Sequence, residues 1–275
     1  MPVTEDRWHA TRRALELAAD RFLALATAND PRAMATADWS IADTVAHVGT
    51  LASINTHLVR FTDSPVHKEM LTTTVDTVAA FNDATLARCP QSNPESVAAT
   101  LRADIDDVLR ASESADPAAP VVWLGGSRVP LCGLLAHLTN ELHIHGYDIA
   151  RSSRSPWQIP AEHAALFFET FFTEVVRLGA GHLFDGDAPP DDRRISVGFR
   201  SRHTTPVSIV LHRGQVSLAD WAAPADARVD FDPVVLNLMM FHRISMARAA
   251  LTGKLRIWGR RPWRLSTFMT SVRAP

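Results

Sequence analysis

The chain has 275 residues, a formal net charge of −2 and 46% hydrophobic residues. That length supports one or two domains with substantial cores, and two cysteines suit a reducing cytosol better than a secreted disulfide scaffold. The start of the chain is acidic and polar, unlike a signal peptide, and no apolar stretch approaches the ~20 residues that span a bilayer. We therefore expect a cytoplasmic protein that does not enter a membrane.

Charge is unevenly distributed along the chain. Residues 193–275 carry 14 Lys or Arg against 4 Asp or Glu, so subtraction from the totals of 28 and 30 leaves 14 against 26 for residues 1–192. We favour two parts that attract each other across an interface; the alternative is a basic wall that faces an anionic substrate. The basic residues form no recognisable nucleic-acid module and few aromatic residues lie among them, so we expect no nucleic-acid partner.

Lysine is rare, because Lys68 and Lys254 leave 26 of the 28 basic residues as arginine. Together with abundant alanine, this is typical of a GC-rich genome such as an actinobacterial one.

Apolar residues recur at three- and four-residue steps through the first 180 residues, which predicts amphipathic helices. We expect helices over 5–28, 40–61, 69–88, 94 to beyond 109, 134–151 and 161–178. Ser40 with Asp43 resembles a capping pair at the start of the second helix, and Cys89-Pro90 ends the third. The Gly-Gly turn within 121–130 predicts a small hairpin that leads into the fifth helix and is placed to cover a site.

The pattern changes after a Gly-, Pro- and Asp-rich linker over 179–192. Alternation of period two predicts antiparallel strands at 195–199, 207–211, 215–218 and 227–231. Two helices, a strand at 255–258 and a last helix from Arg264 follow. We therefore predict a helical domain over 1–185 and a small α+β domain over 193–275.

The helix over 134–151 carries the main candidate site. Glu141 and His145 are four residues apart and share one face, where burial is costly unless a partner such as a metal ion satisfies them. His47 of the second helix would supply a third ligand and leave a fourth position open, as at catalytic zinc sites. His137, on the same face as Glu141, is the alternative or additional ligand. We prefer His47, because bundle sites are normally built from facing helices.

Two motifs link the chain to a known family. Trp-Ser-Ile-Ala-Asp-Thr-Val-Ala-His at 39–47 and Asn-Glu-Leu-His-Ile-His-Gly-Tyr-Asp-Ile-Ala at 140–150 resemble the DinB-like superfamily, and within it the mycothiol-dependent maleylpyruvate isomerase branch. The resemblance implies an up-down helix bundle in which His47, Glu141 and His145 hold a metal. It also implies a sterol-carrier-like C-terminal domain. The family's Gly-Arg pair falls on His242-Arg243, so Arg243 inherits a catalytic or substrate-anchoring role, although the glycine is missing.

Other residues have competing interpretations. Cys132 lies in the first turn of its helix, where a thiol pKa is lowered, yet a small buried hydrophobe is the commoner role. His143 should point away from Glu141, whereas Asp148 either orients the His145 imidazole or caps the helix. Phe81-Asn82 matches a family pair, with a surface role for Asn82 as the alternative.

A divalent metal with an open position can bind a thiol and deprotonate it near neutral pH. We expect zinc, with nickel, iron or manganese as alternatives. The family resemblance implies mycothiol, a sugar-linked cysteine derivative, as thiol cosubstrate. The favoured activity is transfer or exchange of this thiol on a small electrophile, in detoxification or natural-product biosynthesis. The alternatives are cis-trans isomerisation of maleylpyruvate and a non-enzymatic metal- or lipid-binding regulator. Either a monomer or a homodimer is compatible with the sequence.

Overall fold

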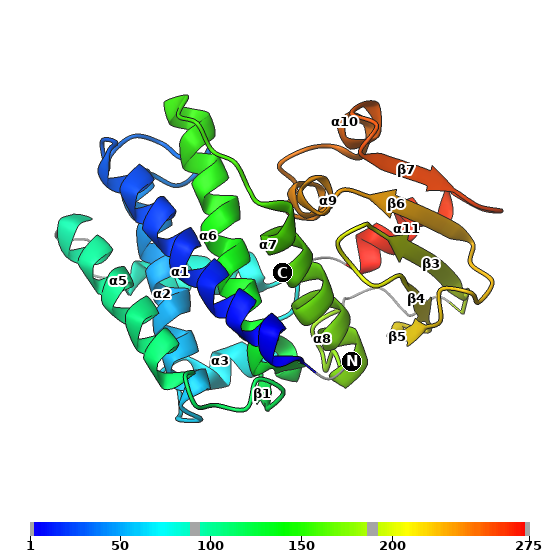
Figure 1. The fold of residues 1–275 in the computed structure, drawn as a ribbon, viewed down its shortest axis with the longest axis horizontal. Coiled ribbons are helices and arrows are strands. Elements are labelled where there is room, and N and C mark those ends of the chain that lie inside the picture. Colours follow the sequence, from blue (N-terminus) through cyan, green and yellow to red (C-terminus); the bar gives the residue numbers. More distant parts are fainter. Residues whose placement is uncertain (1–2, 89–93, 186–191, 273–275) are drawn as a thin grey trace.

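A computed structural model describes residues 3–88, 94–185 and 192–272 of the chain. A helical bundle is followed by an α+β domain built on one sheet, and the two pack side by side (Figure 1). This confirms the fold class predicted from the sequence. Cys89 and Pro90, expected to end the third helix, and residues 186–191 of the expected linker lie outside the described residues.

The bundle surrounds one central helix. Its helices are α1 (Glu5–Thr27), α2 (Ile41–Val59), α3 (His67–Thr72), α4 (Val78–Ala87), α5 (Pro94–Ala111), α6 (Leu131–Ser153), α7 (Ala161–Leu166) and α8 (Thr173–Leu178). Helix α6 contacts α1, α2 and the segment that joins α7 to α8. Nearly all of its side chains are therefore buried, those of Glu141 and Asp148 included. The hairpin of β1 (Pro120–Val122) and β2 (Arg128–Pro130) precedes α6, as predicted.

The prediction of one helix over 69–88 is wrong, because the chain breaks between α3 and α4. Thr73, after the end of α3, has an extended backbone. The hydroxyl of Thr77 accepts a hydrogen bond from the backbone of Thr74, and the backbone N–H of Val75 donates to Leu183. Threonine side chains compete with helical hydrogen bonding in this way, so a run of them favours a turn. The break lets α4 lie beside α2.

The helix predicted over 161–178 is continuous but contains a π-helical segment, Phe167–Phe172, between α7 and α8. The wider turn brings the carbonyl of Thr170 so close to α6 that a Cβ on Gly133 would lie 2.2 Å from its oxygen. Such segments are frequent at functional sites. Here the segment packs the rings of Phe167 and Phe171 against α6.

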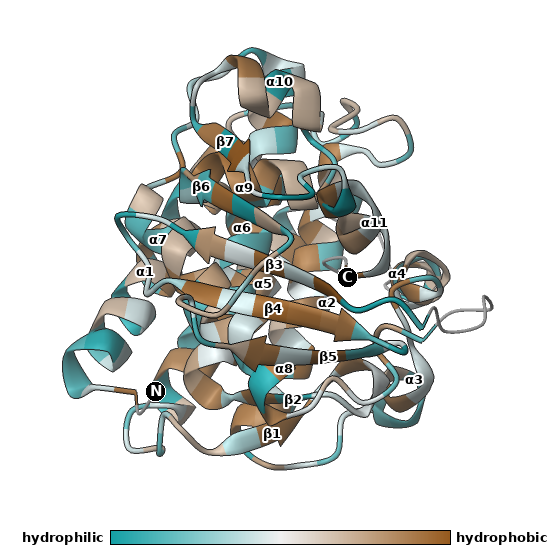
Figure 2. Ribbon diagram, turned by 90° about the vertical axis from the view of Figure 1, so that its right-hand side faces the viewer, coloured by the Kyte–Doolittle hydropathy of each residue, from teal (hydrophilic) through white to brown (hydrophobic). Residues whose placement is uncertain are grey.

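The sheet of the second domain has the strand order β5-β4-β3-β6-β7, which can be followed in Figure 2. Its elements are β3 (Ile195–Arg200), β4 (Val207–His212), β5 (Gln215–Ala219), β6 (Ala227–Phe231), α9 (Pro233–Met240), α10 (Met246–Leu251), β7 (Leu255–Trp258) and α11 (Arg264–Ser271). The predicted strands are present, but β3 and β6 pair in parallel, with Val197 opposite Ala227. The antiparallel expectation is wrong there, because β6 returns to the far side of β3 instead of extending the hairpin.

The two domains share buried contacts. Helix α9 packs on α7, and Phe168 of the π segment lies 5.6 Å from the ring of Phe199 and 5.0 Å from that of Phe231. The amide of Asn237 on α9 donates to Asn140 Oδ1 on α6 at 2.8 Å. The loop after α9 therefore reaches the bundle beside the candidate site. Every helix within residues 3–88, 94–185 and 192–272 is too short or too polar to cross a lipid bilayer.

Candidate metal centre

Helix α2 is fixed at its start by a capping box. The Ser40 hydroxyl accepts a hydrogen bond from Asp43 N at 3.1 Å, and an Asp43 carboxylate oxygen accepts one from Ser40 N at 2.9 Å. This arrangement satisfies N–H groups that a helix start leaves without partners. It places His47 about two turns into the helix, on the side that faces α6.

His47, Glu141 and His145 converge between α2 and α6. The Nε2 atom of His47 lies 3.7 Å from Glu141 Oε2, and that of His145 lies 3.4 Å from the same oxygen. One nitrogen or oxygen atom from each residue lies within 4.8 Å of the other two, and all three side chains are buried. Ligands ~2.1 Å from a tetrahedral ion are about 3.4 Å apart, so these spacings fit three ligands of one cation.

Burial and charge act against each other at this cluster. Burial lowers the pKa of His47 more than Glu141 raises it. Burial alone would raise the pKa of Glu141, but its three histidine neighbours hold that pKa well below its ordinary value. The pKa of His145 is raised, because Asp148 and Glu141 together outweigh the effect of burial. The cluster thus presents an ionised carboxylate among imidazoles, which is the protonation state a metal requires of its carboxylate ligand.

Asp148 connects His145 to the second domain. Its Oδ2 lies 3.4 Å from His145 Nδ1, and its Oδ1 accepts a hydrogen bond from Arg243 Nε at 3.0 Å. A second guanidinium nitrogen of Arg243 pairs with Oδ2, and a third donates to Phe241 O at 2.7 Å. Burial would raise the pKa of Asp148, but His145 and Arg243 lower it. This is how a carboxylate orients a metal-binding imidazole.

His242, where the family resemblance places a glycine, has a backbone conformation that glycine commonly adopts. His242 has φ 58°, in the left-handed region that glycine adopts without strain. The residue before Arg243 thus has a backbone conformation in which glycine would be unstrained. Arg243 touches Asp148 and does not line the pocket described below, so its contact with the site runs through Asp148.

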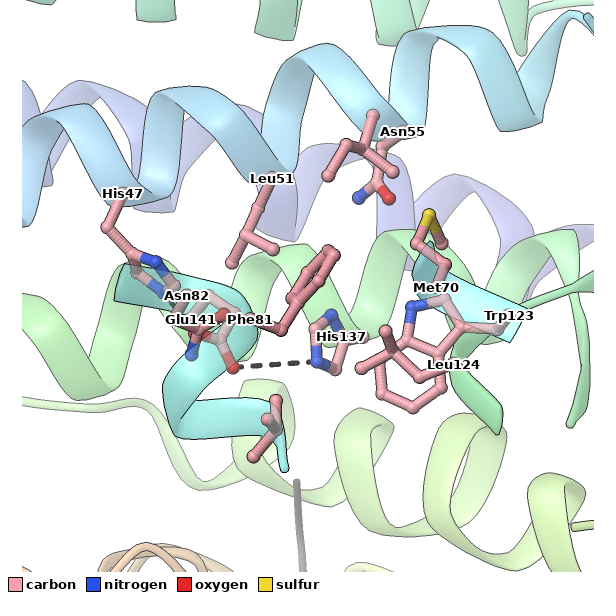
Figure 3. A pocket seen from close by; sticks show the side chains of 12 residues that line it. His47, Leu51, Asn55, Met70, Phe81, Asn82, Trp123, Leu124, His137 and Glu141 are labelled. Atoms are coloured by element: carbon pink, nitrogen blue, oxygen red, sulfur yellow. Dashed lines mark ion pairs between the residues drawn. The ribbon is translucent and has the colours of Figure 1, made fainter. Parts of the chain in front are cut away.

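His137 stands on the other side of the Glu141 carboxylate. Its Nε2 lies 3.5 Å from Glu141 Oε1 (Figure 3), whereas His47 and His145 approach Oε2. The rings of Trp123 and Phe171 pack against it at 4.8 and 4.6 Å, and burial lowers its pKa. His137 is therefore a neighbour of the convergent set and not a member of it.

Trp39, which begins the first family motif, covers two of the imidazoles. Its ring centroid lies 4.7 Å from that of His47 and 5.8 Å from that of His145. An aromatic wall of this kind restricts the rotation of both rings and keeps water from one side of the cluster. Sequence reasoning alone gives Trp39 no role, although its place directly before the Ser40 capping residue is a signal of its position near His47.

A small pocket opens beside the cluster. Figure 3 shows His47, Glu141 and His137 at its edge and Phe81, Met70 and Trp123 around it. It encloses about 490 Å³ of empty space, its open mouth included. The pocket is lined by His47, Leu51, Ile54, Asn55, Met70, Val78, Phe81, Asn82, Trp123, Leu124, His137 and Glu141. Asn82 thus faces the pocket, and the hairpin before α6 covers it through Trp123 and Leu124, as expected.

The remaining predictions have clear outcomes. Cys132 is fully buried, contacts the Thr11 hydroxyl at 3.3 Å and has a pKa raised by burial, which fits a structural side chain and not a nucleophile. His143 points away from Glu141 and bonds His163 of α7 at 2.9 Å. The pocket lining in the described part of the chain contains no arginine or lysine, so the basic wall is not found there.

Facing helices of a bundle that present a buried carboxylate and two imidazoles beside a pocket define a helix-bundle protein with a candidate metal centre. The family model described as the mycothiol maleylpyruvate isomerase N-terminal domain matches residues 4–150, more than half of the chain. The chain therefore belongs to the mycothiol maleylpyruvate isomerase family, a family of enzymes.

Solved structures show the same fold. A crystal structure of the mycothiol-dependent maleylpyruvate isomerase is similar at 13% identity and a TM-score of 0.50, covering 84% of this chain and 87% of that one. A mutant of that isomerase gives 12% identity, the same TM-score and the same coverage. At such low identity the likeness concerns the fold alone. No curated protein matches the chain.

Proposed function

We propose that this protein is a metal-dependent enzyme that uses mycothiol to isomerise maleylpyruvate or a closely related cis-enedioate. The observation that carries the proposal is the buried convergence of His47, Glu141 and His145 in a chain of this family. Family membership supports an enzyme over the non-enzymatic regulator. The comparisons also support the isomerase alternative better than the S-transfer favoured from the sequence, since the family and both structural relatives are named for isomerisation.

His47, Glu141 and His145 would hold the metal, and the donor set of two imidazoles and one carboxylate fits zinc, with nickel, iron or manganese also compatible. A divalent cation bound there supplies charge that keeps a thiol ionised at neutral pH. Asp148, which accepts a hydrogen bond from Arg243, would hold the His145 ring in one orientation. In this role Arg243 is a positioning residue that acts through Asp148.

The apolar lining of the pocket gives the reaction a dry setting. Leu51, Phe81 and Leu124 are on its walls, beside the carboxylate of Glu141. Addition of a thiolate sulfur to one alkene carbon of the substrate turns the double bond into a single bond that can rotate. The electron pair left on the neighbouring carbon then re-forms the double bond and expels the sulfur as thiolate, which leaves the trans isomer, so the thiolate is used and recovered. Exclusion of water protects these intermediate states from side reactions.

The test is an assay of zinc-loaded protein with mycothiol and maleylpyruvate, followed by separation of the cis and trans acids. We expect the trans product with no net consumption of thiol. A thioether product formed with loss of thiol would instead support S-transfer. No acceleration of either reaction over metal-stripped protein would contradict an enzymatic role for the cluster.

A further inference from the structure

Asn55 of α2 carries a buried side-chain amide that lies at the pocket. The residue is 3% exposed, and its Nδ2 has no hydrogen-bond partner among the residues that the structure describes. Its side chain lines the same pocket as His47 and Glu141. Figure 3 shows the amide directed from α2 into the pocket, toward Phe81 and Met70.

An unsatisfied buried N–H group is costly. Leaving a buried donor without a partner forfeits the hydrogen bond that water would supply, whereas a leucine of similar size would have no such cost. Elsewhere in the described chain, Asn140 and Asn237 also have unpaired atoms, but they bond each other across the domain interface and so contribute to packing. The Asn55 Nδ2 makes no comparable hydrogen bond to another described residue, which points to a ligand that supplies the missing acceptor.

The distance between Asn55 and the metal cluster limits which ligands could reach from one to the other. Asn55 follows His47 by eight residues on one helix, which separates them by about 12 Å along the axis. Leu51 lies between them on α2, and Phe81 faces them from α4. The pocket is therefore polar at the cluster, apolar in the middle and polar again at Asn55.

The width of the pocket determines which reactant, mycothiol or the electrophile, can reach Asn55. The pocket is narrow between its lining side chains, so a flat, short carbon chain can enter with small movements of Met70 or Phe81. The sugar groups of a sugar-linked thiol cannot follow it there. The distal end is accordingly left to the electrophile.

We propose that Asn55 donates a hydrogen bond through Nδ2 to an oxygen of the electrophilic substrate, a carboxylate or keto oxygen remote from the carbon that the sulfur attacks. This inference rests on the proposed function and deepens it. It makes Asn55 a specificity-determining residue for small unsaturated acids that have a second oxygen-bearing group. An acid that ends in a methyl group instead would leave the amide unsatisfied and bind more weakly.

The test compares Asn55→Leu with Asn55→Asp, which keeps the volume but replaces the donor with an anionic acceptor. Kinetics in zinc-loaded protein should show a KM for the cis-enedioate raised about 10- to 100-fold in Asn55→Leu, the loss of one hydrogen bond to a charged group, and raised further in Asn55→Asp. The KM for mycothiol and the zinc content should stay unchanged. Asn237→Leu, a buried asparagine outside the pocket, is the matched control and should leave both KM values unchanged.

Two further measurements do not depend on turnover. Without ligand, Asn55→Leu should melt at a higher temperature than the wild type, because an unsatisfied donor is removed, whereas Asn237→Leu should melt lower. Titration calorimetry with maleate should show weaker binding to Asn55→Leu than to the wild type, and equal weak binding of cis-crotonate to both. If the wild type binds maleate without isomerising any cis-enedioate, the proposed function fails while this inference survives. Unchanged maleate binding in Asn55→Leu, no maleate binding to the wild type, or a KM effect confined to mycothiol would overturn the inference.

Discussion

The two sides of α6 bury histidines in opposite electrostatic settings. On the side that faces α2, His145 contacts Glu141 and Asp148, and its pKa is raised. On the side that faces α7, His143 meets the imidazole of His163, and its pKa is lowered to about 3 by burial and by the charges of His163 and Arg21. The two histidines are two residues apart on one helix, so they lie on opposite faces and meet different neighbours.

The carboxylates account for the difference in pKa. A buried imidazole without an acid neighbour is driven to its neutral form, whereas one beside an acid is held in a site of negative potential. The His143 side therefore behaves as a packed, neutral hydrogen-bonded pair, and the Glu141 side as a place for a cation.

Replacing Glu141 with glutamine should remove most of the activity. The variant keeps the size of the side chain but loses the charge that distinguishes this side of α6. We expect loss of bound zinc and a fall in kcat/KM of about 10³-fold or more, a loss of at least ~4 kcal/mol of transition-state stabilisation. Steady-state kinetics and metal analysis provide the measurement. A variant that retains zinc and activity would show that the carboxylate is not a ligand.

Replacing Asp148 with asparagine should weaken metal binding without abolishing it. Loss of the carboxylate that orients a metal-binding imidazole typically costs about 10- to 100-fold in affinity. Competition with a chromogenic chelator measures this affinity, and Arg243→Gln should produce a smaller change in the same direction. Equal zinc affinity in Asp148→Asn and wild type would show that Asp148 does not support metal binding.

On the α7 side, Gly146→Ala should lower stability. A Cβ at this position would lie 2.2 Å from the Trp157 ring, whose Nε1 donates to His143 O at 3.1 Å. Overpacking of this kind costs about 1–3 kcal/mol. Urea unfolding should show that loss, and Gly49→Ala, which has room for the methyl group, serves as control. Because alanine is a better helix former than glycine, Gly49→Ala should be at least as stable as the wild type, and equal losses in both variants would mean that the ring does not control the effect.

The same side should make the metal-free protein sensitive to acid. His143 is neutral in the fold down to about pH 3 but takes up a proton in the unfolded chain below its ordinary pKa of 6.5. The contribution of neutral His143 to the free energy of unfolding is therefore complete above pH 6.5 and is lost as the pH falls from 6.5 toward 3. His143→Asn should have a shallower decline of unfolding free energy over this window, by up to about 1.4 kcal/mol per pH unit. Parallel pH profiles for variant and wild type would contradict the assignment.

Much of the fold could be predicted because local signals agreed with tertiary structure. The Ser40–Asp43 capping box, the apolar period of α6 and the Gly-Gly hairpin each determined an element locally. The break between α3 and α4 could not be predicted, since it depends on a hydrogen bond from Val75 to Leu183, more than 100 residues away. Parallel pairing of β3 with β6 is likewise decided by strand order, which periodicity does not contain.

The candidate site divides in the same way. The four-residue spacing of Glu141 and His145 and the family motif at His47 predicted the convergent set. The contact of Arg243 with Asp148 depends on the turn at His242. A left-handed backbone at that turn could not be predicted, because histidine stands where glycine is expected. Asn55 could not be found from sequence, because only the three-dimensional surroundings show that its amide is buried and lacks a partner.

The central claim is that residues from facing helices hold one divalent cation. Zinc titration of metal-free protein by calorimetry, with His47→Ala and His137→Ala side by side, tests it most directly. We predict one tight site per chain in the wild type and in His137→Ala, and no tight site in His47→Ala. Tight binding that survives in His47→Ala but vanishes in His137→Ala would place the ligands on α6 alone and contradict the claim.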